Sequence, residues 1–575
     1  MTQTNRRRKS GPSALSTETI LLWVGLGFVF VVFGGGWVVL HLGNRLSGSP
    51  QDLPSDPFGL FFALLSGEVE WTGATTGVLV GLLFILAALA GVIGWLWRRR
   101  GRKRSRVDDS ATYMGRGHDL DALTVKGATA TAERLGVKDS PGVPIGRTVA
   151  DKEMLYGSWE DMHVDIWGPR TGKTTSRAIP AILSAPGAVL VTSNKRDVLD
   201  TTRGPRSKKG QVWPFDPQRI ALEEPTWWWN PLSYVTDEVK AAQLAGHFAA
   251  GSRDSDARAD AYFDGEGRNL FAHLLLAAAL DERPITGVYT WLTRPTDDTA
   301  VHILADHGFP LQADGLSGII SAPDKQRAGV FGTAMQMAAC LTNRSIAPWI
   351  TRRGEDDDRP RFDPHAFVRS GGTLYSLSKE GAGTAGPLVT ALTVAVVEAA
   401  EELASTLPGG RLATPMLGVL DEVANVCRWA ELPALYSHYG SRGIVLMSIL
   451  QSWSQGVEVW GEKGMAKLWS ASNVKVYGGG VSEVSFLHEL SQIIGDYDRE
   501  SVSASLSRDG RSTSHQLTSQ ATMDVADLAA IPRGRAVMIA SGAPPTLIET
   551  VPWMQGPHAD VIRASIAENE PGRTP

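Results

Sequence analysis

The sequence predicts an α/β fold in which a mostly parallel sheet is interrupted by an all-α domain and preceded by two transmembrane helices. Three observations lead to this prediction. Two long apolar runs lie near the N-terminus, and from about residue 141 short apolar runs alternate with stretches of helical spacing. Between about 233 and 365, helical spacing alone is found. Strands that alternate with helices form parallel sheets with both faces covered.

The apolar runs at 20–42 and 73–97 contain no Asp, Glu, Lys or Arg, and each is long enough to cross a hydrocarbon core of about 30 Å. A buried pair of soluble helices and a cleaved signal peptide are the alternatives, and the length of the runs disfavours both. Basic residues cluster at 6–9 and at 98–106, whereas the loop between the runs holds Arg45 and four acidic residues. By the positive-inside rule, both termini and the rest of the chain are expected in the cytoplasm, in a multi-pass protein of the cytoplasmic (inner) membrane.

The remaining elements follow from local patterns. Because proline has no backbone N–H to donate to a neighbouring strand, the run that contains Pro214 is expected at the edge of the sheet. Strands are expected at 163–167, 188–193, 211–217, 372–377, 415–420, 443–450, 474–478 and 536–540. Helices are expected at 176–183, 387–403 and 432–439, and in the all-α domain at 239–250, 267–280, 299–307 and 328–341. Residues 499–520 are rich in Ser, Thr and Arg and indicate an exposed excursion.

Composition limits the classes of protein that the chain can belong to. At 575 residues it is too long for one ordinary core. A net charge of −5 argues against a protein that coats nucleic acid by bulk charge, so any such contact must be local. Two cysteines, Cys340 and Cys427, are too few for a disulfide framework and indicate a reducing compartment.

A glycine-rich turn follows the strand expected at 163–167 and precedes a helix, an arrangement that builds a cradle for nucleotide phosphates. Lys173 is expected to reach the β- and γ-phosphates, and the Thr174 hydroxyl to hold Mg²⁺. The usual pattern has four residues between its first glycine and Gly-Lys, whereas three stand between Gly168 and Gly172, so the loop is interpreted as short. A surface turn that merely contains a lysine is the alternative. The expected nucleotide-binding residues are Gly168, Pro169, Arg170, Thr171, Gly172, Lys173, Thr174 and Thr175.

Two carboxylates end the apolar run at 415–420, at the edge where open α/β sheets bind ligands. Asp421 is expected to hold Mg²⁺, directly or through water, and Glu422 to orient and deprotonate the attacking water. A strand that ends in two solvated acids is the alternative. Together with the glycine-rich turn, the pair predicts a P-loop NTPase that uses ATP and Mg²⁺.

These motifs divide the chain into segments. A basic cytoplasmic N-terminus is expected at 1–19, a transmembrane hairpin at 20–97 and a linker at 98–140, with one short helix around 129–135. The nucleotide-binding domain is expected in two parts, 141–232 and 366–555, on either side of the all-α domain at 233–365. The tail at 556–575 is expected to be disordered.

In this order, the segments resemble the coupling ATPases of type IV secretion, the TraG/TraD-like proteins of conjugative DNA transfer. Four further stretches carry the resemblance, which is collinear from about 18 to 555. They are the Asn-Pro turn at 229–232, the aromatic-rich stretch at 262–270, the Arg and Gln-Ser segments at 441–443 and 449–452, and the closing segment at 528–545. The short phosphate loop and Ser193-Asn194, where an acidic residue commonly stands, depart from the pattern of the family.

The resemblance implies a RecA-like fold and a membrane-anchored homo-hexamer. Such a hexamer couples ATP hydrolysis to transfer of single-stranded DNA, with its bound relaxase, through a type IV secretion channel. It also implies that relaxosome proteins and channel components are partners. By the same resemblance, Gln451 would sense the γ-phosphate, and Arg442 would act as an arginine finger across a subunit boundary. A strand-end hydrogen bond and a solvated arginine are the respective alternatives.

Two other functions stay open at this point. An FtsK-like pump for double-stranded DNA shares the membrane spans and the phosphate loop, but no winged-helix module follows the last expected strand. A receptor that binds nucleotide without motor activity would use the all-α domain and the tail to recruit a relaxase or an effector.

Overall fold

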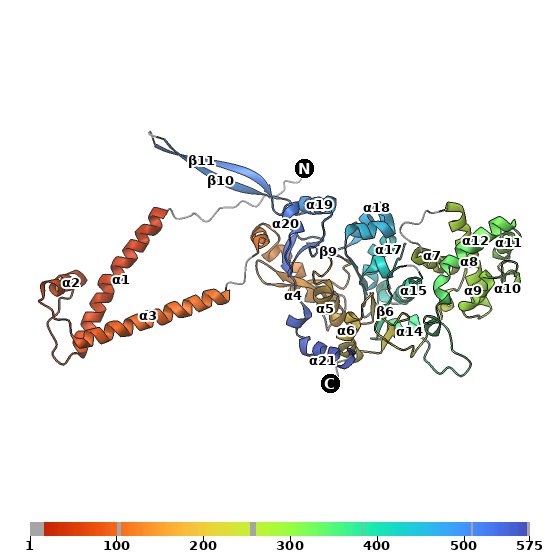
Figure 1. Cartoon of the computed structure of the whole chain (residues 1–575), viewed down its shortest axis with the longest axis horizontal. Coiled ribbons are helices and arrows are strands. Elements are labelled where there is room, and N and C mark those ends of the chain that lie inside the picture. Colours follow the sequence, from red (N-terminus) through yellow and green to blue (C-terminus); the bar gives the residue numbers. More distant parts are fainter. Residues whose placement is uncertain (1–16, 101–104, 253–259, 382, 508–509, 572–575) are drawn as a thin grey trace. The chain divides into compact units, whose positions relative to one another are not determined.

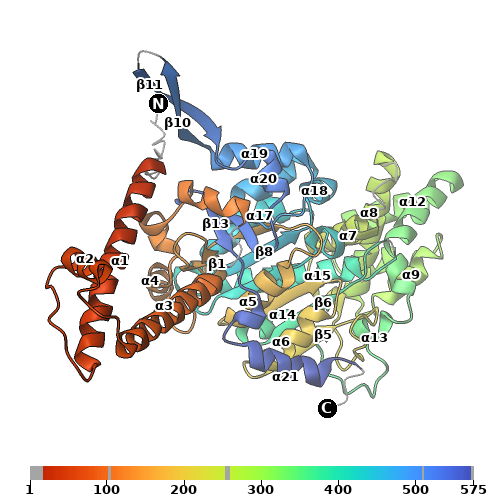
Figure 2. The ribbon, with the colours of Figure 1, turned by 60° about the vertical axis from the view of Figure 1, so that its left-hand side comes forward.

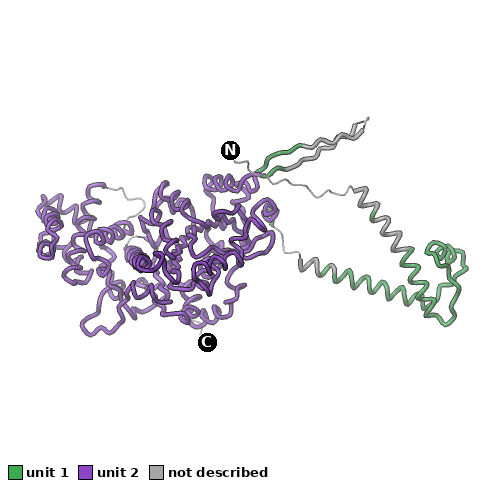
Figure 3. The backbone as a smooth tube through the Cα atoms, turned by 180° about the vertical axis from the view of Figure 1, so that it is seen from behind, with its two compact units in different colours: residues 1–106, 497–520 green, residues 107–496, 521–575 purple. Residues whose placement is uncertain are grey.

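In the computed structural model of the chain, residues 17–100, 105–252, 260–381, 383–507 and 510–571 are described. They form two compact units, one of residues 1–106 and 497–520 and one of residues 107–496 and 521–575 (Figure 3). The larger unit contains an 11-stranded sheet. In order across the sheet, the strands are β2 (Met154–Gly157), β1 (Val143–Thr148), β13 (Thr546–Glu549), β12 (Arg535–Ala540), β9 (Val474–Tyr477), β3 (His163–Ile166), β8 (Ile444–Leu450), β7 (Met416–Leu420), β4 (Val189–Ser193), β6 (Thr373–Leu377) and β5 (Val212–Phe215).

Seven neighbouring strands, from β9 to β5, are parallel, and the other four are antiparallel. The predicted α/β fold with a mostly parallel sheet is thus confirmed, and β5 with Pro214 lies at the edge as expected. Every residue of β7 and β8 is buried, as parallel strands covered on both faces require.

Alternate residues of the central strands pack into two different cores. Leu417 and Val419 of β7 share a core with Ala181 and Ile182 of α5 (Ile179–Ser184), and the core includes residues of α6 (Asp197–Ser207). Met416 belongs instead to the core that contains α15 (Gly386–Ser405) and α17 (Leu432–Tyr439). The two-residue period of a strand therefore buries both faces of the sheet under helices.

Helices alone, with no strand among the described residues, fill the chain between β5 and β6, and they belong to the same compact unit as the sheet. Figure 1 shows most of them gathered at one end of that unit. They are η4 (Pro231–Tyr234), α7 (Glu238–Ser252), α8 (Ala261–Leu280), α9 (Thr286–Leu292), α10 (Thr299–Asp306), α11 (Pro310–Ile320), α12 (Asp324–Met337), η5 (Ala339–Thr342), α13 (Ala347–Ile350) and α14 (Pro364–Arg369).

The segment expected as a linker at 98–140 is folded over most of its described length, and the short helix expected within it, around 129–135, is present as part of α4 (Val125–Arg134). Its last part forms η1 (Arg106–Tyr113), η2 (Gly117–Leu123) and α4 (Val125–Arg134) within the larger unit. Ala128 and Ala132 of α4 are buried. The charges that suggested a linker are partly paired, since Arg535 Nε donates to Asp108 Oδ1 at 2.6 Å. Antiparallel β1 and β2 then follow, and the sequence analysis did not predict either strand.

The tail expected to be disordered forms α21 (Ala559–Asn569), which packs on α6 (Figure 2). Ile562 is fully buried against Ile179 and Leu183 of α5. Ser565 Oγ donates to the carbonyl oxygen of Asp200 at 2.7 Å. A few apolar residues at helical spacing are therefore enough to dock this segment, so the prediction of disorder is wrong for 559–569.

The smaller unit holds α1 (Thr17–Leu46), α2 (Pro57–Ser66), α3 (Gly73–Arg100) and a two-stranded sheet of β10 (Asp496–Ser507) and β11 (Gly510–Ala521). The sheet accounts for the excursion expected at 499–520. Helices α1 and α3 approach closely, because a Cβ added to Gly43 would lie 2.5 Å from Thr75 Cα. Among the described residues, one helix is long and apolar enough to cross a membrane, at Gly73–Val92 within α3.

The docking of α21 leads to a stability prediction. Ile562→Ala should lower the free energy of unfolding by about 2–5 kcal/mol, because it leaves a cavity against α5. Arg563→Ala on the same helix removes only an exposed side chain paired with Asp560 and should cost less than about 1 kcal/mol. Urea denaturation of the full chain measures both variants. Equal effects of the two substitutions would contradict the docking.

Candidate nucleotide-binding site

The glycine-rich turn follows β3 directly and packs against the loop after β9. The Gly168 amide donates to the Gly479 carbonyl oxygen at 2.9 Å, and a Cβ on Gly168 would lie 2.0 Å from the Gly480 carbonyl oxygen. Gly172 has a φ of +100°, a conformation that favours glycine. Both glycines are therefore required by the shape of the turn, one by close approach of backbone and one by its dihedral angle.

The phosphate loop is not short, contrary to the interpretation of the sequence. Counted backward from Lys173, the eight-residue pattern begins at Trp167, which takes the place of the first glycine. The Trp167 amide still donates to the Leu450 carbonyl oxygen at 3.0 Å, so its backbone continues the ladder of β3. Its buried indole fits there because Gly478 has no side chain, and a Cβ on Gly478 would lie 2.1 Å from the ring.

A buried ion pair fixes the helix that follows the loop. The turn Thr174–Ala178 is a π-helix that leads into α5, and its Arg177 is fully buried. Arg177 Nε donates to Asp165 Oδ2 of β3 at 2.7 Å, and Nη1 donates to the Pro144 carbonyl oxygen of β1. Burial, reinforced by the Arg177 charge, holds the pKa of His163 well below its usual value. The sequence analysis missed Arg177 because nothing local distinguishes it from a solvated arginine.

The acidic pair after β7 lies beside the phosphate loop. Because β3, β8 and β7 are parallel neighbours, their carboxyl ends meet at one edge of the sheet. Lys173 Nζ forms an ion pair with Glu422 and lies 3.4 Å from Asp421 Oδ1. The Lys173, Asp421 and Glu422 side chains are 11%, 4% and 1% exposed. The structure thus brings together two stretches that are 249 positions apart in the sequence.

Glu422 is held by further contacts and by its backbone. Its φ of +55° is left-handed, which turns the chain sharply from β7 into α16 (Val423–Val426). Gln451 Nε2 donates to both carboxylate oxygens of Glu422, at 2.8 and 2.9 Å. Asn425 Nδ2 lies 3.3 Å from Glu422 Oε2 and also donates to Glu380 at 3.0 Å. Gln451 therefore reaches the site as expected, whereas Asn425 and Glu380 were not predicted.

Asp421 has the properties of a ligand for a hard cation. Its buried Oδ1 makes no hydrogen bond within the described part of the chain, although the Lys173 ammonium lies nearby. Burial raises the pKa of Asp421 to about 6, with Lys173 opposing the shift and Glu422 and Asp197 adding to it. An unbonded carboxylate oxygen and the Thr174 hydroxyl suit Mg²⁺, which takes few protein ligands besides phosphate oxygens and water.

Arg442 lies away from Lys173 in the same chain. It ends η7 (Gly440–Arg442), just before β8, whereas Gln451 follows the other end of that strand. Seven residues of β8 separate the two ends by about 23 Å. Arg442 Nε lies 3.4 Å from Glu401 Oε1 and 3.1 Å from His438 Nε2. Arg442 and Gln451 therefore lie at opposite ends of β8.

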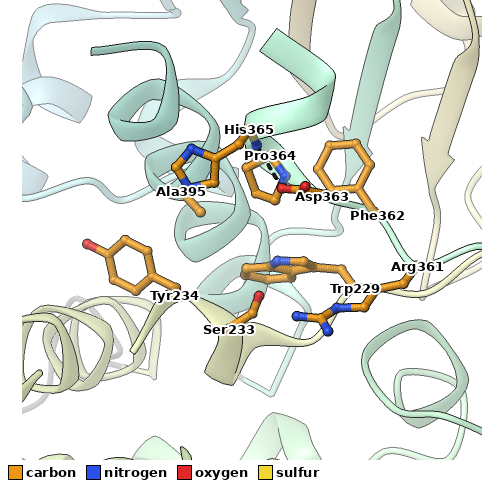
Figure 4. Close-up of a pocket in the computed structure, with 9 residues that line it drawn as sticks. All are labelled: Trp229, Ser233, Tyr234, Arg361, Phe362, Asp363, Pro364, His365 and Ala395. Carbon is orange, nitrogen blue, oxygen red and sulfur yellow. Dashed lines mark hydrogen bonds between the residues drawn. The ribbon is translucent and has the colours of Figure 1, made fainter. Parts of the chain in front are cut away.

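A separate cavity of about 390 Å³ lies between η4, α14 and α15. Its walls come from residues in 229–234 and 361–365 and from Ala395, and they include no residue of the phosphate loop. Figure 4 shows Trp229, Tyr234, Phe362 and His365 around it. Trp229 is fully buried and its indole N–H has no hydrogen-bond partner in the described structure. The cavity thus adjoins the Asn-Pro turn that begins the helical segment.

The sheet, the loop after β3 and the acidic pair after β7 define a RecA-like P-loop nucleotide-binding fold. Residues 415–533 match the family model described as the TraM recognition site of TraD and TraG. No curated protein matches the chain. The family-model match and the structural matches below confirm the predicted resemblance to the coupling proteins of type IV secretion.

The matching solved structures include the bacterial conjugative coupling protein TrwBdeltaN70. Its unbound monoclinic form has 18% identity and a TM-score of 0.51, over 73% of this chain and 91% of that one. TrwB with the non-hydrolysable GTP analogue GDPNP has 17% identity and a TM-score of 0.52, over 73% and 92%. TrwB with ADP and Mg²⁺ has 17% identity and a TM-score of 0.51, over the same shares. At these identities, the matches establish a common fold.

The raised pKa of Asp421 gives a pH-dependent prediction. An acid whose folded pKa lies above its unfolded value of 3.8 loses stabilisation as the pH rises from about 4 to about 6. In nucleotide- and Mg²⁺-free protein at pH 8, Asp421→Asn should therefore raise the free energy of unfolding by up to about 3 kcal/mol. The gain should vanish towards pH 4, as measured by urea denaturation across this range. A destabilisation that is the same at both pH values would contradict the assignment.

Proposed function

We propose that the chain is a membrane-anchored ATPase. It couples ATP hydrolysis to the transfer of single-stranded DNA, with a bound relaxase, through a conjugative type IV secretion channel. The observation that carries the proposal is Lys173 of the phosphate loop placed between Asp421 and Glu422, with Gln451 on Glu422. The likeness to TrwB, whose structures include complexes with GDPNP and with ADP and Mg²⁺, supports nucleotide and Mg²⁺ as ligands.

In this proposal, each residue has a role. Backbone N–H groups of 170–175 would cradle the phosphates, and Lys173 would exchange its contact with Glu422 for phosphate oxygens. Glu422 is then free to orient and deprotonate the attacking water. The Gln451 amide, which contacts Glu422, senses the γ-phosphate. Thr174 and Asp421 hold Mg²⁺, which supplies positive charge next to the transferring phosphoryl group.

The membrane anchor and the assembly belong to the same proposal. The 30-residue helix α1 contains the apolar run 20–42 and pairs with α3, so we infer two spans with both termini in the cytoplasm. A homo-hexamer would place Arg442 of one subunit against the phosphates of the next. The match of 415–533 to the TraM recognition site supports relaxosome proteins as partners.

Removal of the phosphate-contacting lysine tests the hydrolytic site. In the full chain, Lys173→Ala should lower ATP turnover by at least about 100-fold, with and without single-stranded DNA. Glu422→Gln should abolish turnover but retain Mg²⁺-ATP binding. The matched control is Lys152→Ala, whose ammonium is half-exposed on the β1–β2 turn and paired with Glu549. Unchanged turnover in Lys173→Ala would refute the site and favour a receptor without motor activity.

A mixing experiment tests Arg442 as a residue that acts in trans. Arg442→Ala alone should lower turnover by about 1,000-fold or more. An equimolar mixture of Arg442→Ala and Lys173→Ala should recover turnover, because some interfaces then combine an intact phosphate loop with an intact Arg442. Absence of recovery in mixed oligomers verified by pull-down would rule out action across the interface.

A further inference from the structure

The loop of the membrane hairpin contains an apolar helix that the sequence analysis did not predict. Helix α2 has no charged residue, and it is bounded by Asp56, whose carboxylate accepts from the Gly59 amide at 2.7 Å, and by Gly67, whose φ is +77°. The buried residues of α2 are Leu60 and Ala63. The large side chains Phe58, Phe61, Phe62 and Leu65 are 55%, 39%, 66% and 69% exposed. Exposed apolar side chains gathered on one helix mark an interaction surface.

Ring contacts place α2 beside α1 rather than beyond its end. The Phe33 ring lies 4.6 Å from that of Phe58 and 5.1 Å from that of Phe61. Trp37 Nε1 donates to the Ser55 carbonyl oxygen at 3.0 Å. Phe33 stands nine residues before the end of the run 20–42, which corresponds to about 14 Å along a helix. A membrane that covers this run therefore also covers α2.

The rest of the hairpin has the same division between apolar and polar surfaces. Along α3, Val80, Leu83 and Phe84 are 55%, 56% and 77% exposed, as expected of side chains that face lipid. The polar residues of the loop instead bond to one another, since the Gln51 amide donates to Asn44 Oδ1 and the Glu70 amide to Gln51 Oε1, both at 2.9 Å. The polar part of the loop is thus held together by its own hydrogen bonds.

We propose that α2 is embedded in the acyl chains of the membrane leaflet at the loop end of the hairpin. The proposal rests on the membrane anchor proposed above. Lipid is the occupant that fits, because a ten-residue apolar helix that contacts the span at Phe33 lies at a depth where only acyl chains surround α1. The polar stretches at 44–54 and 67–72 are then the surface left for contacts outside the membrane.

Site-specific fluorescence on the full chain in phospholipid nanodiscs tests this placement. Phe62→Cys and Leu65→Cys place an environment-sensitive dye on α2, Leu86→Cys places it on α3, and Ser49→Cys places it in the polar loop. The native Cys340 and Cys427 are buried, and the unmodified chain measures their background labelling. The quenchers are a phospholipid with a nitroxide on its acyl chain and, separately, aqueous iodide.

The expected result is lipid quenching at 62, 65 and 86 that exceeds the quenching at 49 by about twofold or more, with the reverse order for iodide. Iodide quenching at 62 and 65, with lipid quenching retained at 86, would overturn the placement of α2 and leave the anchor intact. It would identify α2 as a surface exposed to water for a protein partner. Loss of lipid quenching at 62, 65 and 86 together would overturn both proposals.

Discussion

The arrangement of the site depends on one cation that serves two buried carboxylates. Lys173 forms an ion pair with Glu422 and lies 3.4 Å from Asp421, where water has little access. One ammonium cannot neutralise two carboxylates. Burial is the main cause of the raised pKa of Asp421, and the charge of Glu422 adds to it. A buried pair of this kind stabilises little by itself. In the proposed function, the uncompensated negative charge would favour a divalent cation, and phosphates that attract Lys173 would release Glu422.

The sheet makes this arrangement possible. Parallel pairing of β3 with β8 and of β8 with β7 brings residues 168, 421 and 451 to one edge, although they come from distant parts of the sequence. Close contact between the backbones of Gly168 and Gly480 sets the position of the loop, and Arg177 on Asp165 fixes the helix that follows. The phosphate loop is thus held on both sides by interactions that do not involve a ligand.

Buried charged residues account for some of the differences between the expected and the observed structure. Arg206 is fully buried and donates to Thr373 Oγ1 and to the Ala185 and Gly187 carbonyl oxygens. Asp108 likewise pairs with Arg535 in the segment interpreted as a linker. Burying a charged side chain costs much less free energy when hydrogen-bond or ion-pair partners satisfy it. Here those partners lie far away in the sequence. Local composition therefore led to the wrong prediction for the segment that contains Asp108.

The sequence alone determined the elements whose cause is local. Apolar runs with the period of a buried strand predicted β3, β4, β6, β7 and β8, and the identities of Lys173, Asp421 and Glu422 predicted the chemistry of the site. Only the tertiary structure decided which side chains meet. It packed the Trp167 indole against Gly478, directed Gln451 to Glu422, separated Arg442 from the phosphate loop and folded α2 against Phe33. The physical reason is that periodicity and propensity act over a few residues, whereas ion pairs, close backbone contacts and shared burial join residues that only the complete fold brings together.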